Sequence, residues 1–292
     1  MRADRAAHMR AAAGLEIDIG GAAPKAGRLP GDDERPLVAL APPPETAGFS
    51  SYDVLGVPVS VTTLQTASRA IELWARDQVG RFVCVRDVHG IMRSREDAEL
   101  KALHQDAAMV TPDGMPLVWL GRRAGHAVER TCGADLMEKV LGDSERTGLR
   151  HYLYGGKPGV AARLKARFEA RFPALNIVAT EAPPFAALTA DEFLAVAGRI
   201  RASRADVVWV GLSTPKQEFL MRDLARLVPA TLIGVGAAFD FHTGAVRRAP
   251  RWMQKSGLEW LHRLISEPKR LWRRYLVLAP RFVWLLATAN RS

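Results

Sequence analysis

One aspartate follows a predicted strand in a turn that could present it to a substrate. Asp113 lies in the sequence Thr111-Pro112-Asp113-Gly114, directly after an apolar run that ends at Val110. Proline and glycine at these positions favour a tight turn, and Pro116 suits the first position of a following helix. Such a turn would hold the Asp113 carboxylate at the rim of a sheet, where it could face a bound ligand and take part in catalysis. An aspartate here can equally accept a hydrogen bond from its own backbone, so the spacing alone leaves both roles open.

A glycine-rich loop follows a second predicted strand and could approach a phosphate or a sugar ring closely. Gly155, Gly156 and Lys157 lie between an apolar run, residues 151–154, and a helical pattern. Glycines allow backbone N–H groups to reach an anion. The loop matches neither the P-loop pattern nor G-x-G-x-x-G, so a plain strand-to-helix turn is an equal alternative.

A third loop, residues 211–218, ends in polar residues that could face the same ligand. Thr214 as N-cap, with Gln217 three residues later, predicts a capping box at the start of a helix. Capping alone would explain Gln217. In the functional alternative, Lys216, Gln217 or Glu218 lies at the mouth of the cleft and contacts the ligand.

The sequence disfavours several common cofactor sites. The stretch Gly234-Val235-Gly236 lacks the third glycine of a dinucleotide fingerprint and follows the last predicted strand, which argues against a Rossmann dehydrogenase. The predicted folded part has neither an Asp-x-Asp pair nor a His-x-x-x-His cluster, so we expect no metal site and no cofactor. If the chain binds a nucleotide-sugar, cationic side chains must take the place of Mg²⁺. Cys84 and Cys132 lack C-x-x-C spacing and indicate reduced thiols.

The middle of the chain alternates short β-branched runs with longer amphipathic stretches. Predicted strands cover residues 82–85, 108–110, 151–154, 177–179, 207–210 and 231–235, and predicted helices include 158–172, 189–203 and 215–228. This alternation is typical of an α/β fold, a Rossmann-like parallel sheet flanked by helices, which binds ligands at the carboxyl ends of its strands. We therefore expect an α/β catalytic domain over residues 49–244. Residues 1–48 contain no aromatic residue and are rich in Ala, Gly and Pro, which predicts a disordered tail.

The C-terminal segment, residues 245–292, contains most of the chain's positive charge. It has 11 basic and two acidic residues, so it contributes +9 of the net charge of +10, and it holds four of the seven tryptophans. Apolar residues recur there at helical spacing, which predicts a basic, Trp-rich helical appendage. Its arginines and tryptophans indicate binding to a diphosphate, to an anionic membrane surface, or to both. No apolar run is long enough to span a bilayer and no signal peptide is evident, so we expect a cytoplasmic protein. A nucleic-acid-binding protein using this basic segment is one alternative, and another nucleotide-binding α/β enzyme is a second.

Five stretches of the chain, taken in order, resemble the WecG/TagA/CpsF glycosyltransferases (glycosyltransferase family 26). They are residues 111–119, 155–159, 211–218, 248–252 and 257–260. The resemblance implies an inverting, metal-independent enzyme that moves a sugar from a UDP-sugar to a polyprenyl-diphosphate-linked acceptor at the inner face of the cytoplasmic membrane. Such enzymes build wall teichoic acid linkers, enterobacterial common antigen or exopolysaccharide units. The implied donor carries N-acetylmannosamine, its uronic acid or a glucose-type sugar, and no nucleic-acid partner is implied.

The same resemblance implies roles for individual residues. Asp113 would be the general base that takes the proton from the acceptor hydroxyl, and Gln217 would contact a sugar. Arginines of the last helices would fold over the cleft and neutralise the UDP leaving group; their spacing places them on one helical face if that helix continues through Pro268. The implied substrate-binding residues are Thr111, Arg130, Gly155, Gly156, Lys157, Gln217, Arg263, Arg270 and Arg273.

The chain departs from the family pattern after the first predicted strand of the sheet. Where the family commonly has Thr-x-Asn, this chain has Val85-Arg86-Asp87. The hydroxyl is absent, and Asp87 adds a charge to the expected cleft. Asp87 is therefore the alternative base, and His89 is a less favoured one. A changed donor sugar is a consequence we expect from this departure.

Overall fold

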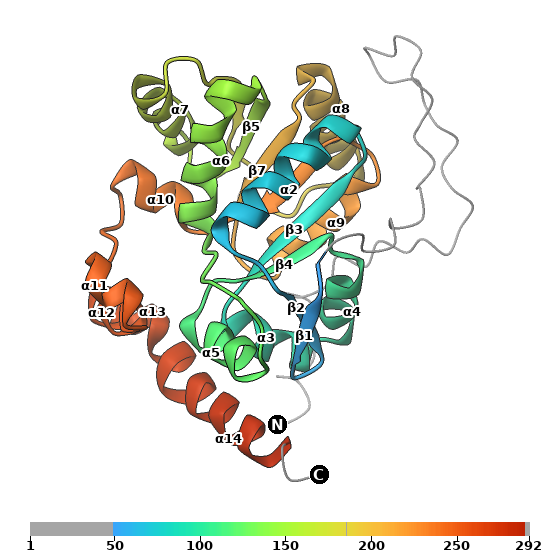
Figure 1. Cartoon of the computed structure of the whole chain (residues 1–292). Helices are drawn as coiled ribbons and strands as arrows, with labels where there is room; N and C mark the ends of the chain where they lie inside the picture. The colour runs from blue at the N-terminus through green and yellow to red at the C-terminus, as the bar shows by residue number, and fades with distance from the viewer. Residues whose placement is uncertain (1–48, 185, 290–292) are drawn as a thin grey trace, which may run out of the picture.

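Six parallel strands in the order β4-β3-β8-β7-β5-β6 form the centre of the computed structural model, with helices on both faces (Figure 1). The predicted α/β fold, a parallel sheet flanked by helices and followed by a helical C-terminal region, is confirmed. The structure describes residues 49–184 and 186–289, so the predicted disordered tail, residues 1–48, lies outside the described residues.

The strands of the sheet correspond closely to the β-branched runs of the sequence. They are β3 (Arg81–Arg86), β4 (Met109–Pro112), β5 (Arg150–Gly155), β6 (Asn176–Glu181), β7 (Val207–Gly211) and β8 (Thr231–Gly234). The helices between and after them are α2 (Leu64–Asp77), α3 (Val88–Glu96), α4 (Ala98–Asp106), α5 (Met115–Arg123), α6 (Gly133–Thr147), α7 (Val160–Arg171), α8 (Ala190–Ser203), α9 (Lys216–Ala225) and α10 (Ala238–Thr243). Helix α8 begins with a capping box, which Thr189 and Glu192 form.

Alternate side chains of the strands pack into two hydrophobic clusters, because successive residues of a strand point to opposite faces. Trp209 of β7 lies in the cluster that includes residues of α2, α6 and α7, and Val210 lies in the cluster that includes residues of α3, α4, α8 and α9. Both side chains are fully buried. The sheet is therefore covered on both faces, and its strand ends are where a ligand can reach it.

A short hairpin that the sequence analysis did not predict lies beside β4. Strands β1 (Ser51–Val54) and β2 (Val57–Ser60) are antiparallel, and Leu55 and Gly56 between them have φ values of 54° and 86°. The hydroxyl of Ser60 accepts a hydrogen bond from Val110 N at 3.0 Å. The hairpin thus supports the strand that leads into the Asp113 turn.

The C-terminal helices run along the outside of the sheet domain as far as Ala289 (Figure 1). They are α11 (Arg251–Lys255), α12 (Glu259–Ser266), α13 (Pro268–Trp272), the π-helix η1 (Arg273–Leu278) and α14 (Ala279–Ala289). The condition for a shared helical face is not met, because the helix does not continue through Pro268: α12 ends at Ser266, and Pro268 is the first residue of α13, where its missing N–H costs nothing. Arg263 and Arg270 therefore belong to different helices.

Across the described ranges, no helix is both long and apolar enough to span a bilayer.

Candidate active site

The Asp113 carboxylate lies at the carboxyl end of β4, as the sequence predicted. Asp113 N donates to Arg86 O at 2.7 Å, which ties the turn to the end of the neighbouring strand β3. The Asp113 side chain remains 34% exposed, so a ligand can reach its oxygens. Arg130 donates two hydrogen bonds to Asp113: its Nε donates to the backbone oxygen at 2.5 Å, and its Nη2 donates to Oδ1 at 3.1 Å.

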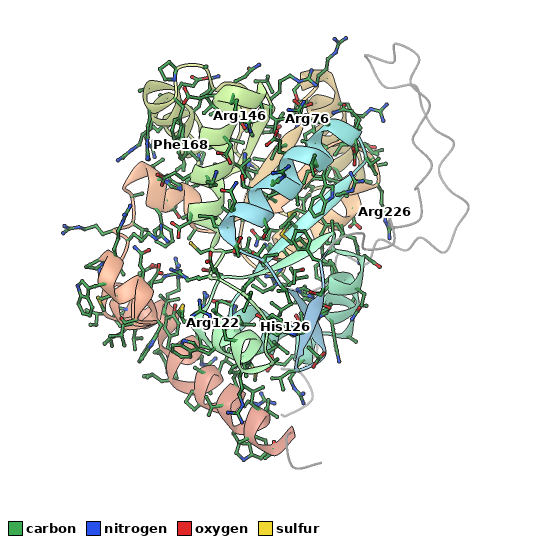
Figure 2. The ribbon with its side chains drawn as sticks, in the orientation of Figure 1. Arg76, Arg122, His126, Arg146, Phe168 and Arg226 are labelled. Carbon is green, nitrogen blue, oxygen red and sulfur yellow. The ribbon has the colours of Figure 1, made fainter. Side chains whose placement is uncertain are left out.

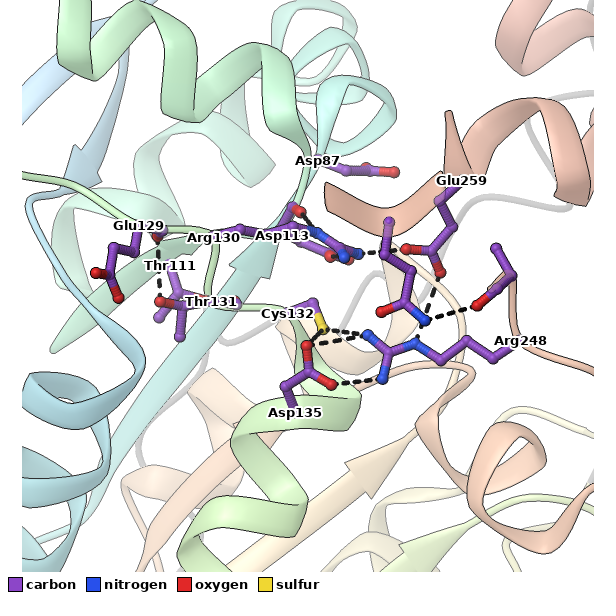
Figure 3. Close-up of polar contacts among 12 residues, drawn as sticks. Asp87, Thr111, Asp113, Glu129, Arg130, Thr131, Cys132, Asp135, Arg248 and Glu259 are labelled. Atoms are coloured by element: carbon purple, nitrogen blue, oxygen red, sulfur yellow. Dashed lines mark hydrogen bonds and ion pairs between the residues drawn. The ribbon is translucent and has the colours of Figure 1, made fainter. Parts of the chain in front are cut away.

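Arg130 also links this turn to the C-terminal helices. Its Nη2 lies 2.6 Å from Oε2 of Glu259, the first residue of α12, so one guanidinium holds two carboxylates (Figure 3). Thr111 of β4 holds the segment next to Arg130 in place. Its fully buried hydroxyl donates to Thr131 O at 3.0 Å and fixes the segment that carries Arg130. Thr111 is thus a support for Arg130 in this structure, where the sequence analysis expected a substrate-binding residue.

Asp87, the alternative base, follows β3 and caps helix α3. Its Oδ1 accepts from Gly90 N at 2.9 Å, which is an N-cap hydrogen bond. Its Oδ2 forms an ion pair with Arg274 of η1. Both carboxylate oxygens are therefore engaged by the protein itself.

The surroundings of the two aspartates shift their pKa values in opposite directions. Burial raises the pKa of the Asp113 carboxyl above its ordinary value; Arg130 lowers it, and Asp87 and Glu259 raise it further. Burial alone would also raise the pKa of Asp87. There, however, the Arg274 guanidinium, the charge of His89 and the Gly90 amide together outweigh burial and hold the pKa well below its ordinary value. Two acidic groups with pKa values displaced in opposite directions suit two different roles.

A buried ionic network lies behind these carboxylates at the ends of β3 and β7. Arg86 and Glu218 are almost fully buried, with 2.5 Å between Arg86 Nη2 and Glu218 Oε1. Arg86 Nε donates to Nε2 of His104 at 2.7 Å, and burial lowers the pKa of His104 to about 3, so this imidazole is neutral. The network fixes the backbone from which Asp87 projects.

Gln217 belongs to that network, and the predicted capping box is wrong. Gln217 is buried, its Nε2 donates to Glu218 Oε1 at 2.7 Å, and its Oε1 accepts from Gly236 N at 3.2 Å. Helix α9 begins at Lys216 without a side-chain cap. Gln217 thus ties the loop after β7 to the loop after β8, using both ends of its amide.

The glycine loop after β5 lies against the end of β7. Gly155 has a φ of 148°, and a Cβ there would stand 2.6 Å from Gly211 O, so only glycine fits. Gly156 N donates to that same oxygen at 3.1 Å. Lys157 beyond it is exposed. The close strand contact accounts for the glycines by itself, and phosphate binding by this loop stays a prediction.

Three arginines expected at the cleft occupy different surroundings. Arg263 of α12 is half-buried over the ring of Phe241, 5.6 Å from its centroid, and is close enough to Asp113 to lower the pKa of that carboxyl. Arg270 pairs with Glu267 and is 64% exposed. Arg273 is exposed and lies over Trp272. Only Arg263 of this set reaches the Asp113 cluster here.

Sequence reasoning missed three charged residues that the structure brings to the site. Arg274 pairs with Asp87. Glu259 pairs with Arg130, and Arg248 binds Asp135 at the start of α6, with its Nη2 also 3.0 Å from the Cys132 sulfur (Figure 3). Arg248 and Glu259 belong to two of the stretches that resemble the glycosyltransferases, and this was the one sequence signal that could have singled them out.

Arginines near the amino ends of the strands, opposite to the site, have different surroundings from this cluster. Arg76 and Arg146, at the ends of α2 and α6, share Glu72 on the surface at 3.3 and 3.2 Å (Figure 2). Their side chains are 54% and 74% exposed. Such exposed pairs contribute little to stability, whereas Arg130 and Arg248 are only 18% and 21% exposed.

The fold and this cluster together define an α/β enzyme whose accessible carboxylate and surrounding guanidiniums meet at the carboxyl ends of parallel strands. Residues 52–292 match the model of the glycosyl transferase WecG/TagA/CpsF family. The chain belongs to this family, and it is a glycosyltransferase of cell-surface polysaccharide synthesis. The resemblance drawn from the sequence is confirmed.

Proposed function

We propose that this chain transfers a sugar from a UDP-sugar to a polyprenyl-diphosphate-linked acceptor with inversion, using Asp113 as the general base. The observation that carries this proposal is the environment of Asp113. Its carboxylate is accessible, lies at a strand end among guanidiniums, and has a pKa raised by burial. A base with a raised pKa removes a hydroxyl proton more readily than an ordinary aspartate.

The proposed reaction is a single displacement. The acceptor hydroxyl attacks the anomeric carbon while Asp113 takes its proton, and the bond from that carbon to the UDP oxygen breaks on the opposite face. The departing diphosphate gains negative charge, which arginines stabilise through charge-assisted hydrogen bonds. Arg263 is the arginine of the expected set best placed for this, because it is half-buried beside the Asp113 cluster. Contacts from Arg270, Arg273 and Lys157 to substrate stay predictions.

Asp87 is a poorer base than Asp113 in this arrangement. Its ion pair with Arg274 lowers its pKa, and its other oxygen caps α3. We assign it an orienting role. The donor sugar, whether N-acetylmannosamine, its uronic acid or a glucose-type sugar, remains the range that the family resemblance implies.

The C-terminal helices would rest on the membrane that carries the acceptor, on its cytoplasmic face. Their outer surface combines basic side chains with exposed apolar ones: Trp252 and Trp284 are each 63% exposed, and Leu276 is 57% exposed. Indole rings favour the lipid headgroup region, and arginines favour anionic headgroups. A lipid-linked acceptor would then enter the site from the side that these helices cover.

Asp113→Asn tests the proposed base. We expect sugar transfer to fall about 100- to 10,000-fold, because the amide cannot take the proton. Binding of UDP, measured by calorimetry, should survive, since the substitution is isosteric. Asp77→Asn is the control. Asp77 is 51% exposed and pairs with Arg81 at the amino end of β3, the end opposite to the site, so the activity of this variant should match that of the wild type. Full activity in Asp113→Asn would remove Asp113 as the base, and a wild-type chain that does not bind UDP would contradict the proposed donor.

A further inference from the structure

The inner face of the last helices presents an arginine that the sequence did not single out. Leu271 and Phe282 are buried and mark that face, and Arg274 lies between them with its side chain 23% exposed. Its neighbour Arg273 points outward and is exposed. Both residues belong to the π-helix η1. π-Helices are rare in proteins, and those that occur are often found at functional sites.

Arg274 is only partly satisfied by the protein. Its Nη2 pairs with Asp87, and its guanidinium lies 5.5 Å from the centroid of the Tyr275 ring. Its Nε is buried without a hydrogen-bond partner among the described residues, and the same is true of Nε of Arg263. A buried donor without an acceptor is costly. Both arginines lie close enough to Asp113 to interact with its charge. The Arg274 side chain is 23% exposed and a guanidinium has five N–H donors, so donors that Asp87 does not use can reach an acceptor group from outside the chain.

Asp87 fixes the direction of this arginine. The carboxylate is held at one oxygen by Gly90 N and at the other by Arg274, so it cannot turn freely. An aspartate that stays ionised keeps its attraction for the guanidinium throughout the neutral range. The replacement of the family's Asn by Asp at this position therefore gives Arg274 a charged partner.

We propose that Arg274 binds the diphosphate of the nucleotide-sugar and that Asp87 positions it. This inference rests on the proposed function, because it names a further group that contacts the leaving UDP. A guanidinium has five N–H groups, so Arg274 can pair with the Asp87 carboxylate and still donate hydrogen bonds to phosphate oxygens. Asp87 is in this view a positioning residue, and Asp113 alone takes the proton.

The chain offers a matched control for Arg274. Arg281 of α14 pairs with Glu96, the last residue of α3, at 3.2 Å, and Asp87 caps the first turn of that same helix. The pairs Arg274–Asp87 and Arg281–Glu96 thus join the same two regions, one inside the site and one at the surface. If Arg274 only tethers the last helices, the two arginines should behave alike.

The experiment measures the affinity of full-length variants for UDP and UMP by calorimetry in solution without membranes. We expect Arg274→Ala to weaken UDP binding about tenfold or more and UMP binding clearly less, because the second phosphate loses a charge-assisted contact. Arg274→Lys should recover part of the loss, and Arg281→Ala should bind both ligands like the wild type. Equal losses in Arg274→Ala and Arg281→Ala, or an unchanged UDP affinity in Arg274→Ala, would overturn the assignment.

Asp87→Asn tests the positioning role separately, since an asparagine can still cap α3. We expect UDP affinity to fall several-fold while the acid limb of the kcat pH profile stays where it is in the wild type. A variant that binds UDP normally but loses turnover would make Asp87 the base and refute its positioning role. Failure of the wild-type chain to bind UDP would instead count against the proposed function itself, so the two failures are distinguishable.

Discussion

The sheet domain and the C-terminal helices are held in place by different forces. In the sheet domain, Trp209 and Tyr154 are fully buried between layers of helix and strand. Among the described side chains of residues 251–289, only Leu271 and Phe282 are buried, while Trp252 and Trp284 stay largely exposed. Apolar burial thus stabilises the first region, whereas the second is positioned by a few ion pairs and by the packing of Phe282, Leu285 and Leu286 of α14 on the core. The position of the helices therefore depends more on ligands, salt and surfaces than the sheet does.

The ion pairs of the two regions also differ: the one in the sheet domain is buried, and the one in the C-terminal helices is exposed. Arg86 and Glu218 lie inside the sheet domain, where water cannot replace either partner. Arg281 and Glu96 join the last helix to α3 with side chains 55% and 41% exposed. Removing one partner of a buried pair leaves an uncompensated charge, whereas removing one partner of an exposed pair leaves a hydrated one.

The largest expected effect in this comparison comes from Glu218→Ala. The substitution strands the Arg86 guanidinium in the interior, so the free energy of unfolding in urea should fall by about 3–5 kcal/mol. Glu96→Ala is its counterpart at the surface and should change the same quantity by no more than about 1 kcal/mol. Similar losses in the two variants would show that the two regions are not held by different forces.

The local part of this architecture could be predicted from the sequence. The strands were found because β-branched runs alternate with helical patterns, and the Asp113 turn was found because its proline and glycine encode it locally. The hairpin β1–β2 was missed because each strand has only four residues and one contains Pro58.

The long-range part could not be predicted. Glu259 reaches Arg130 and Arg274 reaches Asp87 across more than a hundred residues, and no local pattern encodes such pairs. Gln217 fitted a local capping rule, but its amide bonds Gly236 instead. The choice between Arg273 and Arg274 depends on the π-helix, which shifts the helical periodicity used to assign faces.

The exposed tryptophans give the next test of the comparison. Trp252→Ser combined with Trp284→Ser should weaken binding to anionic phosphatidylglycerol liposomes by about tenfold or more, because both indoles lose the interfacial environment. The melting temperature should barely change, since neither ring is packed in a core. Leu73→Ser is the control: Leu73 is 56% exposed on α2 and should leave liposome binding intact. Unchanged sedimentation of the double variant with liposomes would argue that these helices do not lie on the membrane.

The smallest expected effect is an opposite pH dependence of stability for the two aspartates. Asp113 has a raised pKa in the folded state, so it stabilises the fold in acid and that contribution is lost as pH rises through the folded pKa. Asp87 has a lowered pKa, so its contribution is present at neutral pH and is lost as pH falls through the acid range.

At pH 7, Asp113→Asn should therefore be as stable as the wild type or slightly more stable, and Asp87→Asn should lose about 1 kcal/mol. Urea unfolding of both variants and of the wild type, at pH 7 and in the acid range, measures these differences in the free energy of unfolding. In acid the deficit of Asp87→Asn should shrink, and Asp113→Asn should lose any advantage. The same sign of change for both variants at pH 7 would mean that the two carboxylates share one environment, and the division of roles between base and positioning residue would then lose its physical basis.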